Sequence, residues 1–367
     1  MTEQELSAYI QAIRPADEAA MEAARRRQAQ LAKPPGSLGQ LEEISIRLAG
    51  VTGQVCPAMG KCRVAVFAAD NGVVAEGVSC TPPAVTMQQA VNMTFRKTGM
   101  SAMAAAFGDD VSVVDVGIDG DVPPVGVLDR KVRRGTGDIA REDAMTPQQV
   151  LDAMAAGMEQ AARARADGVT ALGIGEMGIG NTTTSAAVLA ALTGADIEAV
   201  TGRGGGLTDE GFLRKKEVLR QALALHRPDG NDVIGVLAGV GGLDLAAMTG
   251  AFLGCAHERV PAAVDGFISI AAALCAVRLC PAVRDVLFLS HDSYEVGYRI
   301  AAEALGLQPC LRLGMRLGEG SGCPLLFRVL EGACGVMRGM ATFGEASIED
   351  SYLDEIRAMD AFTVEGA

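Results

Sequence analysis

The pattern of apolar and polar positions along the chain changes near residue 60. Before it, helical sequence dominates: residues 15–33 are rich in helix formers and end at Pro34-Pro35. After it, short β-branched runs alternate with alanine-rich helical stretches. Strands that alternate with helices are typical of βαβ units. The pattern therefore predicts an α/β fold with a doubly wound, mostly parallel sheet and helices on both faces.

Five apolar runs predict the strands of this sheet. Helical stretches separate them, such as residues 146–166 with Thr146 as the expected N-cap. Turns with glycine, aspartate or serine follow the runs. Ligands of open α/β sheets bind beyond the carboxyl ends of the strands, so we expect a functional site at these turns. The predicted strands span residues 63–70, 111–118, 169–174, 260–266 and 285–290.

The length of the chain allows a large core and more than one domain. It has 367 residues, of which 49% are hydrophobic. We expect residues 60–340 to form a Rossmann-like α/β catalytic domain. Residues 1–59 together with residues 341–367 are expected to form a small helical domain.

Charge and aromatic content exclude some classes of partner. The formal net charge of −13 argues against nucleic acid and anionic membranes as partners. Aromatic residues make up 4% of the chain and tryptophan is absent, which argues against stacking on single-stranded nucleic acid. A small anionic substrate stays possible, because local amides and cations can outweigh the global charge.

The cysteines and the apolar segments predict a cytoplasmic protein. The nine cysteines show no CxxC pair and no metal-type spacing, so we expect reduced, buried thiols. The polar, acidic start of the chain does not resemble a signal peptide. The most apolar run, residues 266–283, contains Arg278 and Pro281, which argues against a membrane span.

A glycine-rich turn after the third predicted strand is a candidate anion site. Glycines at 173, 175, 178 and 180 precede a helix that starts at Asn181 or Thr182. Free N–H groups at a helix N-terminus favour phosphate. The spacing Gly173-x-Gly175-x-x-Gly178 also matches a dinucleotide fingerprint, which leaves an NAD-dependent oxidoreductase as an alternative. Glu176 inside the loop argues against that alternative, because it would repel a pyrophosphate.

A second glycine cluster follows at residues 201–207. It contains Gly202, Arg203 and Gly204, and the predicted helix after Thr208 carries Lys215 two turns in. Arg203 could hold a carboxylate or phosphate. A flexible turn followed by a solvated basic face is the structural alternative. Together the two clusters suggest one phosphate that is bound mainly by backbone amides.

Other polar turns carry weaker signals. Asp70 ends the first predicted strand, and Gln88 or Gln89 could present an amide to a ligand. His291 stands near Asp292 and Glu295, but no second histidine is near enough in the sequence to indicate a metal site. No nucleophile elbow of a serine hydrolase is present.

One carboxylate, Glu319, lies between two glycines in the stretch "GMRLGEGSG" (314–322). It is either a solvated loop residue, for example paired with Arg316, or a general base with neighbours small enough to admit a flat substrate. The local sequence supports both interpretations equally.

Taken together, these segments resemble the nicotinate-nucleotide–dimethylbenzimidazole phosphoribosyltransferases, the CobT family of cobalamin lower-ligand assembly. The resemblance covers nearly 300 residues in order. It includes "KPPGSLGQLE" (33–42), "AADNGVVAEGVS", "PPAVTMQQAVN", "GIGEMGIGNTTTSAA", "TGRGGGL", "VDGFISIAAAL", "SH-S-E" and "LGMRLGEGSG". Two places depart from the family: Leu243-Asp244 stands where a Phe-Glu pair is usual, and Asp292 and Tyr294 stand where Arg or Leu and Ala are usual.

The resemblance implies an enzyme that moves phosphoribose from nicotinate mononucleotide to 5,6-dimethylbenzimidazole or a related base, with inversion. The products are α-ribazole 5′-phosphate and nicotinate. It also implies a homodimer and identifies Glu319 as the catalytic base. We assign Glu176 to the ribose or to the charge of an oxocarbenium-like transition state as a hypothesis.

The resemblance and the motifs together imply a set of substrate-binding residues. No metal and no cofactor are expected, because no pyrophosphate leaves. A carrier of nucleotides or azoles without turnover is the non-catalytic alternative. The expected substrate-binding residues are Gly175, Gly178, Gly180, Asn181, Thr182, Gly202, Arg203, Gly204, Lys215, Asp70, Ser79, Gln88 (favoured over Gln89 by family spacing), Asp265, Ser290, His291, Ser293 and Leu317.

Overall fold

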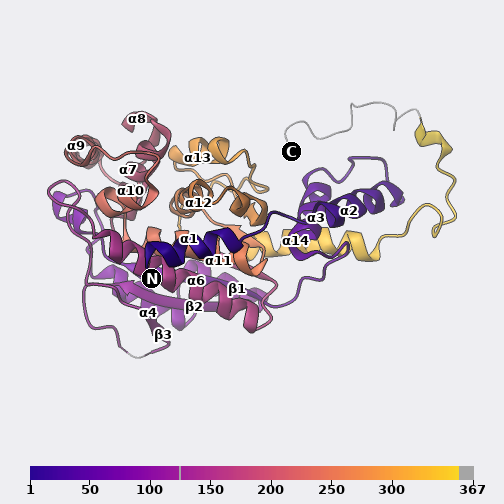
Figure 1. The fold of residues 1–367 in the computed structure, drawn as a ribbon, viewed down its shortest axis with the longest axis horizontal. Coiled ribbons are helices and arrows are strands. Elements are labelled where there is room, and N and C mark those ends of the chain that lie inside the picture. The colour runs from indigo at the N-terminus through magenta and orange to yellow at the C-terminus, as the bar shows by residue number, and fades with distance from the viewer. Residues whose placement is uncertain (124, 355–367) are drawn as a thin grey trace.

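A six-stranded parallel sheet forms the centre of the computed structural model, which describes residues 1–123 and 125–354 (Figure 1). The strand order β3-β2-β1-β4-β5-β6 reverses direction between β1 and β4. This is the doubly wound order, and it confirms the predicted fold class. The strands are β1 (Cys62–Ala69), β2 (Asp110–Gly117), β3 (Val127–Asp129), β4 (Ala171–Met177), β5 (Ala262–Val264) and β6 (Leu287–Leu289).

Five of these strands lie where the apolar runs predict them, whereas β3 carries no such run. Its three residues are half-buried or exposed at the edge of the sheet. A short edge strand buries little apolar surface, so the hydrophobic pattern gives no signal for it.

Helices cover both faces of the sheet. On one face α11 (Leu243–Glu258) packs between α6 (Pro147–Ala166) and α12 (Phe267–Leu279) and contacts β1, β2 and β4. On the other face α14 (Cys323–Gly339) contacts β1, β4 and β5. The remaining helices of this part are α4 (Val85–Thr94), α5 (Gly99–Phe107), α7 (Asn181–Thr193), α8 (Ile197–Val200), α9 (Asp209–His226), α10 (Val233–Val240) and α13 (Gly297–Leu305).

A second, smaller hydrophobic cluster lies apart from the main core. It joins α2 (Glu18–Gln30), α3 (Gln40–Thr52) and the end of α14, which runs from the sheet to these helices in Figure 1. The segment after α14 pairs with the residue after α2, since Ala32 N–H donates to the carbonyl of Ala341 at 2.9 Å. Both ends of the chain therefore contribute to a small helical unit.

The first helix does not belong to this unit. Helix α1 (Glu3–Ala12) contacts α11, and the N-terminal amine pairs with Asp152 of α6 at 2.9 Å. Only part of the expected small domain of residues 1–59 and 341–367 therefore packs as one unit. Residues 355–367 lie outside the described residues. The exact domain boundaries remain a prediction.

N-cap side chains stand at the starts of two helices, and a third helix has no side-chain cap. Thr146 caps α6 with a capping box, and the Thr208 hydroxyl accepts the N–H of Gly211 at the start of α9. Helix α3 starts after Gly39, which has no side chain to offer as a cap.

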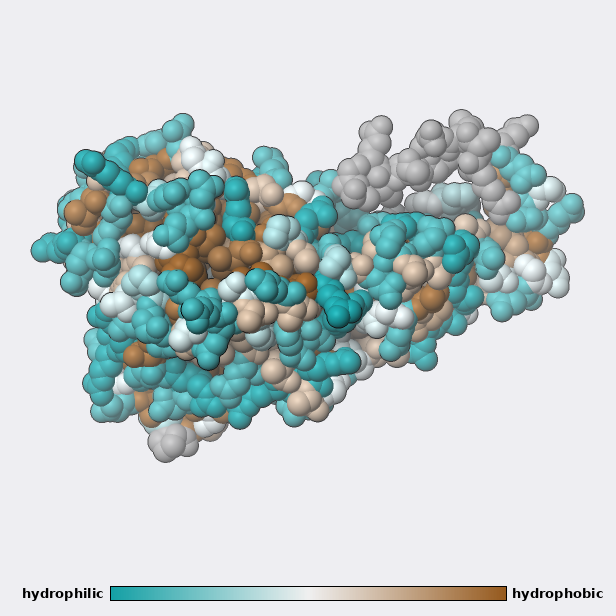
Figure 2. Space-filling model, in the orientation of Figure 1, coloured by the Kyte–Doolittle hydropathy of each residue, from teal (hydrophilic) through white to brown (hydrophobic). Residues whose placement is uncertain are grey.

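Hydrophilic residues cover most of the face shown in Figure 2, and hydrophobic residues gather in its left half. None of the helices in the described part of the chain is long and apolar enough to span a bilayer.

All nine cysteines are free, but Cys80 is exposed, so the expectation that the thiols are buried is wrong at that position.

Candidate active site

A cavity of about 300 Å³ opens at the carboxyl ends of β1, β4, β5 and β6, where the strand order reverses. Open α/β sheets bind ligands at this position. Segments far apart in the sequence form its walls. Among the residues expected at the site, those that line this cavity are Ser79, Glu176, Gly178, Gly180, Asn181, Thr182, Arg203, Gly204, Asp265, His291, Ser293, Leu317 and Glu319.

Glu319 faces this cavity from a strained turn. Its φ of 65° is unusual for a residue with a side chain. Its carboxylate accepts the N–H of Met100, in the first turn of α5, at 3.2 Å. Burial raises the pKa of Glu319, and the Met100 hydrogen bond opposes that rise. Glu319 as a residue is 6% exposed, so its carboxylate lies in a site with little water.

Both glycines beside Glu319 are required by close approaches. A Cβ on Gly318 would lie 2.5 Å from Oε1 of Glu176, and Gly318 has a φ of 80°. A Cβ on Gly320 would lie 2.8 Å from a methyl group of Val64, at a φ of 82°. Larger residues would move the turn away from the sheet. The glycines therefore hold Glu319 against β4.

Glu176 lies at the end of β4 and is fixed by two donors. Its Oε1 accepts the N–H of Glu319 at 3.2 Å, and its Oε2 accepts the side-chain amide of Asn181. Burial, with a contribution from the nearby Asp244, raises the pKa of Glu176 to about 8. Most Glu176 side chains are therefore protonated near neutral pH.

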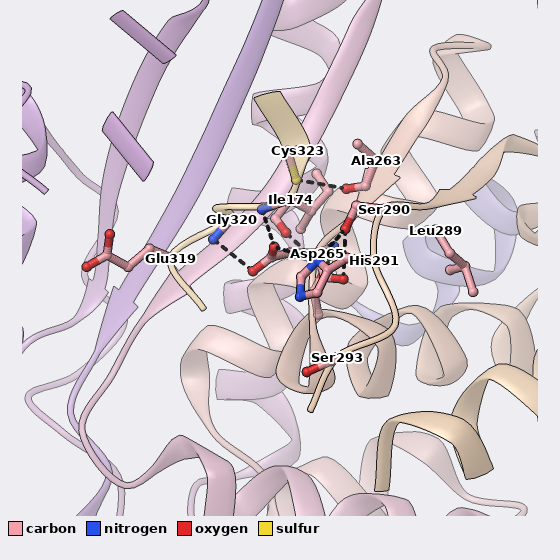
Figure 3. Close-up of polar contacts among 12 residues, drawn as sticks. Ile174, Ala263, Asp265, Leu289, Ser290, His291, Ser293, Glu319, Gly320 and Cys323 are labelled. Atoms are coloured by element: carbon pink, nitrogen blue, oxygen red, sulfur yellow. Dashed lines mark hydrogen bonds and ion pairs between the residues drawn. The ribbon is translucent and has the colours of Figure 1, made fainter. Parts of the chain in front are cut away.

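Asp265, after β5, holds the turn that follows Glu319 (Figure 3). Its carboxylate accepts the N–H groups of Gly320 at 3.1 Å and Gly322 at 2.6 Å. Nδ1 of His291 lies 3.9 Å from the same carboxylate and 3.0 Å from the Ser290 hydroxyl. Burial raises the pKa of Asp265, and His291 opposes that rise. These contacts position the turn rather than a metal.

The two glycine clusters are joined by Lys215. Its side chain is fully buried, and Nζ donates to the Thr182 hydroxyl at 2.8 Å and to the carbonyl of Gly202 at 3.1 Å. Burial lowers the pKa of Lys215 to about 8. The ammonium has three N–H groups, so one is not used by these two bonds. The cavity wall here combines glycines of both clusters with the N-terminus of α7.

Several expected substrate ligands do not line the cavity. Asp70 accepts the N–H of Asp119 at 2.8 Å and ties the ends of β1 and β2 together. Gly175 allows the backbone at Glu319 to approach β4, since a Cβ there would lie 2.7 Å from the carbonyl of Glu319. The members of the expected set outside the lining are Asp70, Gln88, Gly175, Gly202, Lys215 and Ser290.

The choice between the two glutamines differs from the sequence expectation. Gln88 is exposed, whereas Gln89 lines the cavity. The Gln89 carbonyl oxygen accepts the side-chain amide of Asn92 at 3.0 Å, which leaves its NH₂ group for a ligand. Residues one position apart on a helix point about 100° away from each other, and here Gln89 is the one that lines the cavity.

Two expected ligands use donors of their side chains within the protein: both amide hydrogens of Asn181 and two of the five N–H groups of Arg203. The Arg203 guanidinium donates to the carbonyl of Leu207 at 2.9 Å and to Asp209. The Asn181 amide nitrogen donates to Glu176 and, at 3.0 Å, to Asp244. Neither side chain offers these donors to a phosphate in this arrangement.

Sequence reasoning missed some residues at the site. Asp244 was noticed only as a departure from the family pattern, and no local motif marks it as part of this network. Met177, Gly266, Phe267 and Ser269 also line the cavity. Their position at or shortly after the ends of predicted strands was the one signal that could have found them.

The glycine-rich turn does not have the geometry of a dinucleotide site. Gly173 packs inside the sheet against Cys323, and helix α7 begins only at Asn181, after all four glycines. Glu176 lies at the end of β4, directly before the turn. Within residues 1–123 and 125–354, no three histidine, cysteine or acidic side chains are grouped as metal ligands.

Comparisons with known proteins agree with one family. A family model described as "Phosphoribosyltransferase" matches residues 13–348. A nicotinate-nucleotide–dimethylbenzimidazole phosphoribosyltransferase of Clostridium perfringens is 46% identical over 341 residues, 93% of this chain and 94% of the relative. One of Geobacter metallireducens is 45% identical over 347 residues, 94% of this chain and 98% of the relative.

A solved structure gives the same result. The crystal structure of CobT from Thermus thermophilus superposes with a TM-score of 0.87 at 45% identity, over 91% of this chain and 100% of that one. The fold, the strand-end cavity and the full-length sequence similarity thus lead to one conclusion: this chain belongs to the nicotinate-nucleotide–dimethylbenzimidazole phosphoribosyltransferase family.

Proposed function

We propose that this protein transfers 5-phosphoribose from nicotinate mononucleotide to 5,6-dimethylbenzimidazole or a related base, giving α-ribazole 5′-phosphate and nicotinate. The observation that carries the proposal is a buried carboxylate, Glu319, in a strand-end cavity bounded by two glycine clusters, in a member of this family. Relatives with 45–46% identity carry the name of this activity.

Glu319 acts as the general base on the incoming azole. The carboxylate accepts the proton of the benzimidazole N–H while the other ring nitrogen attacks C1′ of the ribose. The bond from C1′ to the pyridinium nitrogen breaks as the new bond forms on the opposite face. Nicotinate leaves with a neutral ring nitrogen and needs no proton. A single base therefore balances the reaction.

The 5′-phosphate binds at the glycine clusters. Residues 178–182, which lead into α7, and residues 204–206 line the cavity, and the N-terminus of α7 favours an anion there. The unused N–H of Lys215 adds a positive charge next to them. Phosphate bound here would offset the cost of burying that charge.

Glu176 binds the ribose. Because its pKa is about 8, the side chain is mostly neutral at pH 7 and can donate a hydrogen bond to a ribose hydroxyl. This favours ribose binding over stabilisation of positive charge on the ring.

The protein works as a homodimer in the cytoplasm. Large apolar side chains lie exposed on the segments around the cavity: Tyr294 is 70%, Leu313 57% and Leu317 57% exposed. Exposed apolar residues of this size, gathered near a site, favour contact with a second copy. Light scattering of the purified protein tests this proposal, and a monomer at micromolar concentration would contradict it.

The reaction is tested directly with purified protein. The enzyme is incubated with nicotinate mononucleotide and a panel of bases, and products are followed by chromatography and mass. The anomeric configuration is read by NMR. An α-ribazole phosphate that is absent with Glu319→Gln would support both the reaction and the base. Nucleotide binding without product from any base would favour a carrier instead.

A further inference from the structure

Asp244 is a buried carboxylate that does not line the cavity. It lies in the first turn of α11 and is fully buried. Its Oδ1 accepts the N–H of Leu245 at 2.9 Å, and its Oδ2 accepts the side-chain amide of Asn181 at 3.0 Å. Burying a carboxylate without a cation costs free energy, so a buried aspartate at this position requires an explanation.

The Asn181 amide links Asp244 to the site. An amide nitrogen has two hydrogens, and here each has its own carboxylate: one goes to Asp244 and one to Glu176. With both donors fixed, the amide cannot rotate without losing two bonds. Glu176 in turn accepts the N–H of Glu319 at 3.2 Å. The bonds form a continuous chain from α11 to the turn that carries the base.

The surrounding backbone makes room for Asp244. A Cβ on Gly178 would lie 2.6 Å from Oδ2 of Asp244, and one on Gly242 would touch Oδ1 even more closely. Two glycines from distant segments therefore leave the space that this carboxylate fills.

We propose that Asp244 is a positioning residue of the transfer reaction, which fixes the Asn181 amide and, through Glu176, the turn that presents Glu319. The inference rests on the proposed function. Asp244 does not touch substrate; it acts through the two residues between it and the base.

Asp244 also influences the charge of Glu176. The groups that face the Glu176 carboxyl are Asp244 of α11, Asp265 after β5, the Asn181 amide and the N–H of Glu319. The negative charge of Asp244 is one cause of the raised pKa of Glu176. Removing that charge therefore lowers the pKa of Glu176 and shifts the part of the pH–rate profile that depends on it.

The test is a double-mutant cycle between positions 244 and 176. Asp244→Asn keeps the shape but offers one acceptor oxygen where two are needed, so either Asn181 or Leu245 loses its partner. We expect kcat to fall about tenfold and KM for nicotinate mononucleotide to change less than about twofold. In the Glu176→Ala background the same change should lower kcat by less than about twofold, because both oxygens that form the link are absent.

Asp109→Asn is the matched control. Asp109 is also a buried carboxylate, paired with Arg328 at 2.9 Å, but it has no contact with the site. We expect a lower Tm with unchanged kcat. If Asp244→Asn does not fold, Asn181→Ala removes the same chain from its middle and should show the same loss of kcat.

Two results overturn the inference: unchanged kcat and pH profile in Asp244→Asn, or equal losses with and without Glu176. A wild-type protein that forms no product would instead contradict the proposed function itself. The two failures are therefore distinguishable.

Discussion

The backbone N–H of Glu319 donates a hydrogen bond to Oε1 of Glu176 at 3.2 Å, across 143 positions of sequence. This bond joins the turn between α13 and α14 to the end of the central strand β4. It places two carboxylates of different character in one cavity. Glu176 is held mostly neutral by burial, whereas Glu319 keeps a donor, Met100 N–H, that stabilises its anion.

Replacing Glu319 with glutamine tests the base. The amide keeps the size of the side chain but cannot take a proton, so kcat should fall by roughly 10²–10⁴-fold, as expected for general base catalysis. The KM for nicotinate mononucleotide should change little. Steady-state kinetics measures both values, and Glu303→Gln, an exposed carboxylate on α13, is the control. Full activity of Glu319→Gln would remove it from the mechanism.

Replacing Glu176 with glutamine should change the pH dependence of stability. The folded-state pKa of about 8 lies above the ordinary value of 4.5, so the folded protein holds a proton that the unfolded chain releases between these values. This contribution to stability is fully present below about pH 4.5 and is lost as the pH rises through about 8.

Glutamine mimics the protonated acid at every pH. The free energy of unfolding of Glu176→Gln, taken relative to wild type, should therefore increase from about pH 5 to about pH 8.5. The increase should be on the order of a few kcal/mol. Denaturant unfolding at both pH values measures the difference. An equal difference at both would mean that Glu176 does not change its protonation in this range.

Lys215 and Lys216 form a matched pair on α9. Lys215→Met removes the buried ammonium, and we expect KM for nicotinate mononucleotide to rise roughly 10–100-fold, as for the loss of a charged hydrogen bond. Lys216→Met, whose ammonium lies 4.4 Å over the ring of Phe212, should leave KM unchanged. Because the pKa of Lys215 is about 8, wild-type KM should also rise as the pH increases through that value. Equal KM values for both variants would exclude Lys215 from phosphate binding.

The two adjacent glutamines of α4 offer a second pair. Gln89→Ala should raise KM for the base by about 2–10-fold, since Gln89 lines the cavity and a neutral hydrogen bond to the base would be lost. Gln88→Ala should stay within about twofold of wild type, because Gln88 is exposed. A larger rise of KM in Gln88→Ala than in Gln89→Ala would show that α4 rotates when the base binds.

Much of the fold follows from the sequence pattern. The period of apolar residues predicted five strands and the parallel order, because strands buried on both faces must be apolar throughout. The short edge strand β3 was not predicted because it is barely buried. Glycine clusters and the glycine-flanked Glu319 indicated the site, because few other sequences allow backbone to approach a ligand so closely.

The roles of individual side chains needed the tertiary structure. Lys215 was expected to help bind a phosphate, and the structure adds that its side chain is buried and joins two loops. Arg203 was expected to bind a ligand; it lines the cavity, and part of its guanidinium donates to its own loop. A side chain's partners come from segments that are distant in sequence, and no local pattern reports them.

The sequence by itself determined the α/β architecture, the strand ends at which the site lies and the carboxylate between two glycines. These features depend on hydrophobic periodicity and on backbone freedom, which are local properties. Only the tertiary structure decided that Asp244, Asn181, Glu176 and Glu319 form one chain of hydrogen bonds and that Gln89 rather than Gln88 faces the cavity. Hydrogen bonds and raised pKa values depend on which groups are buried together, and packing of distant segments sets that.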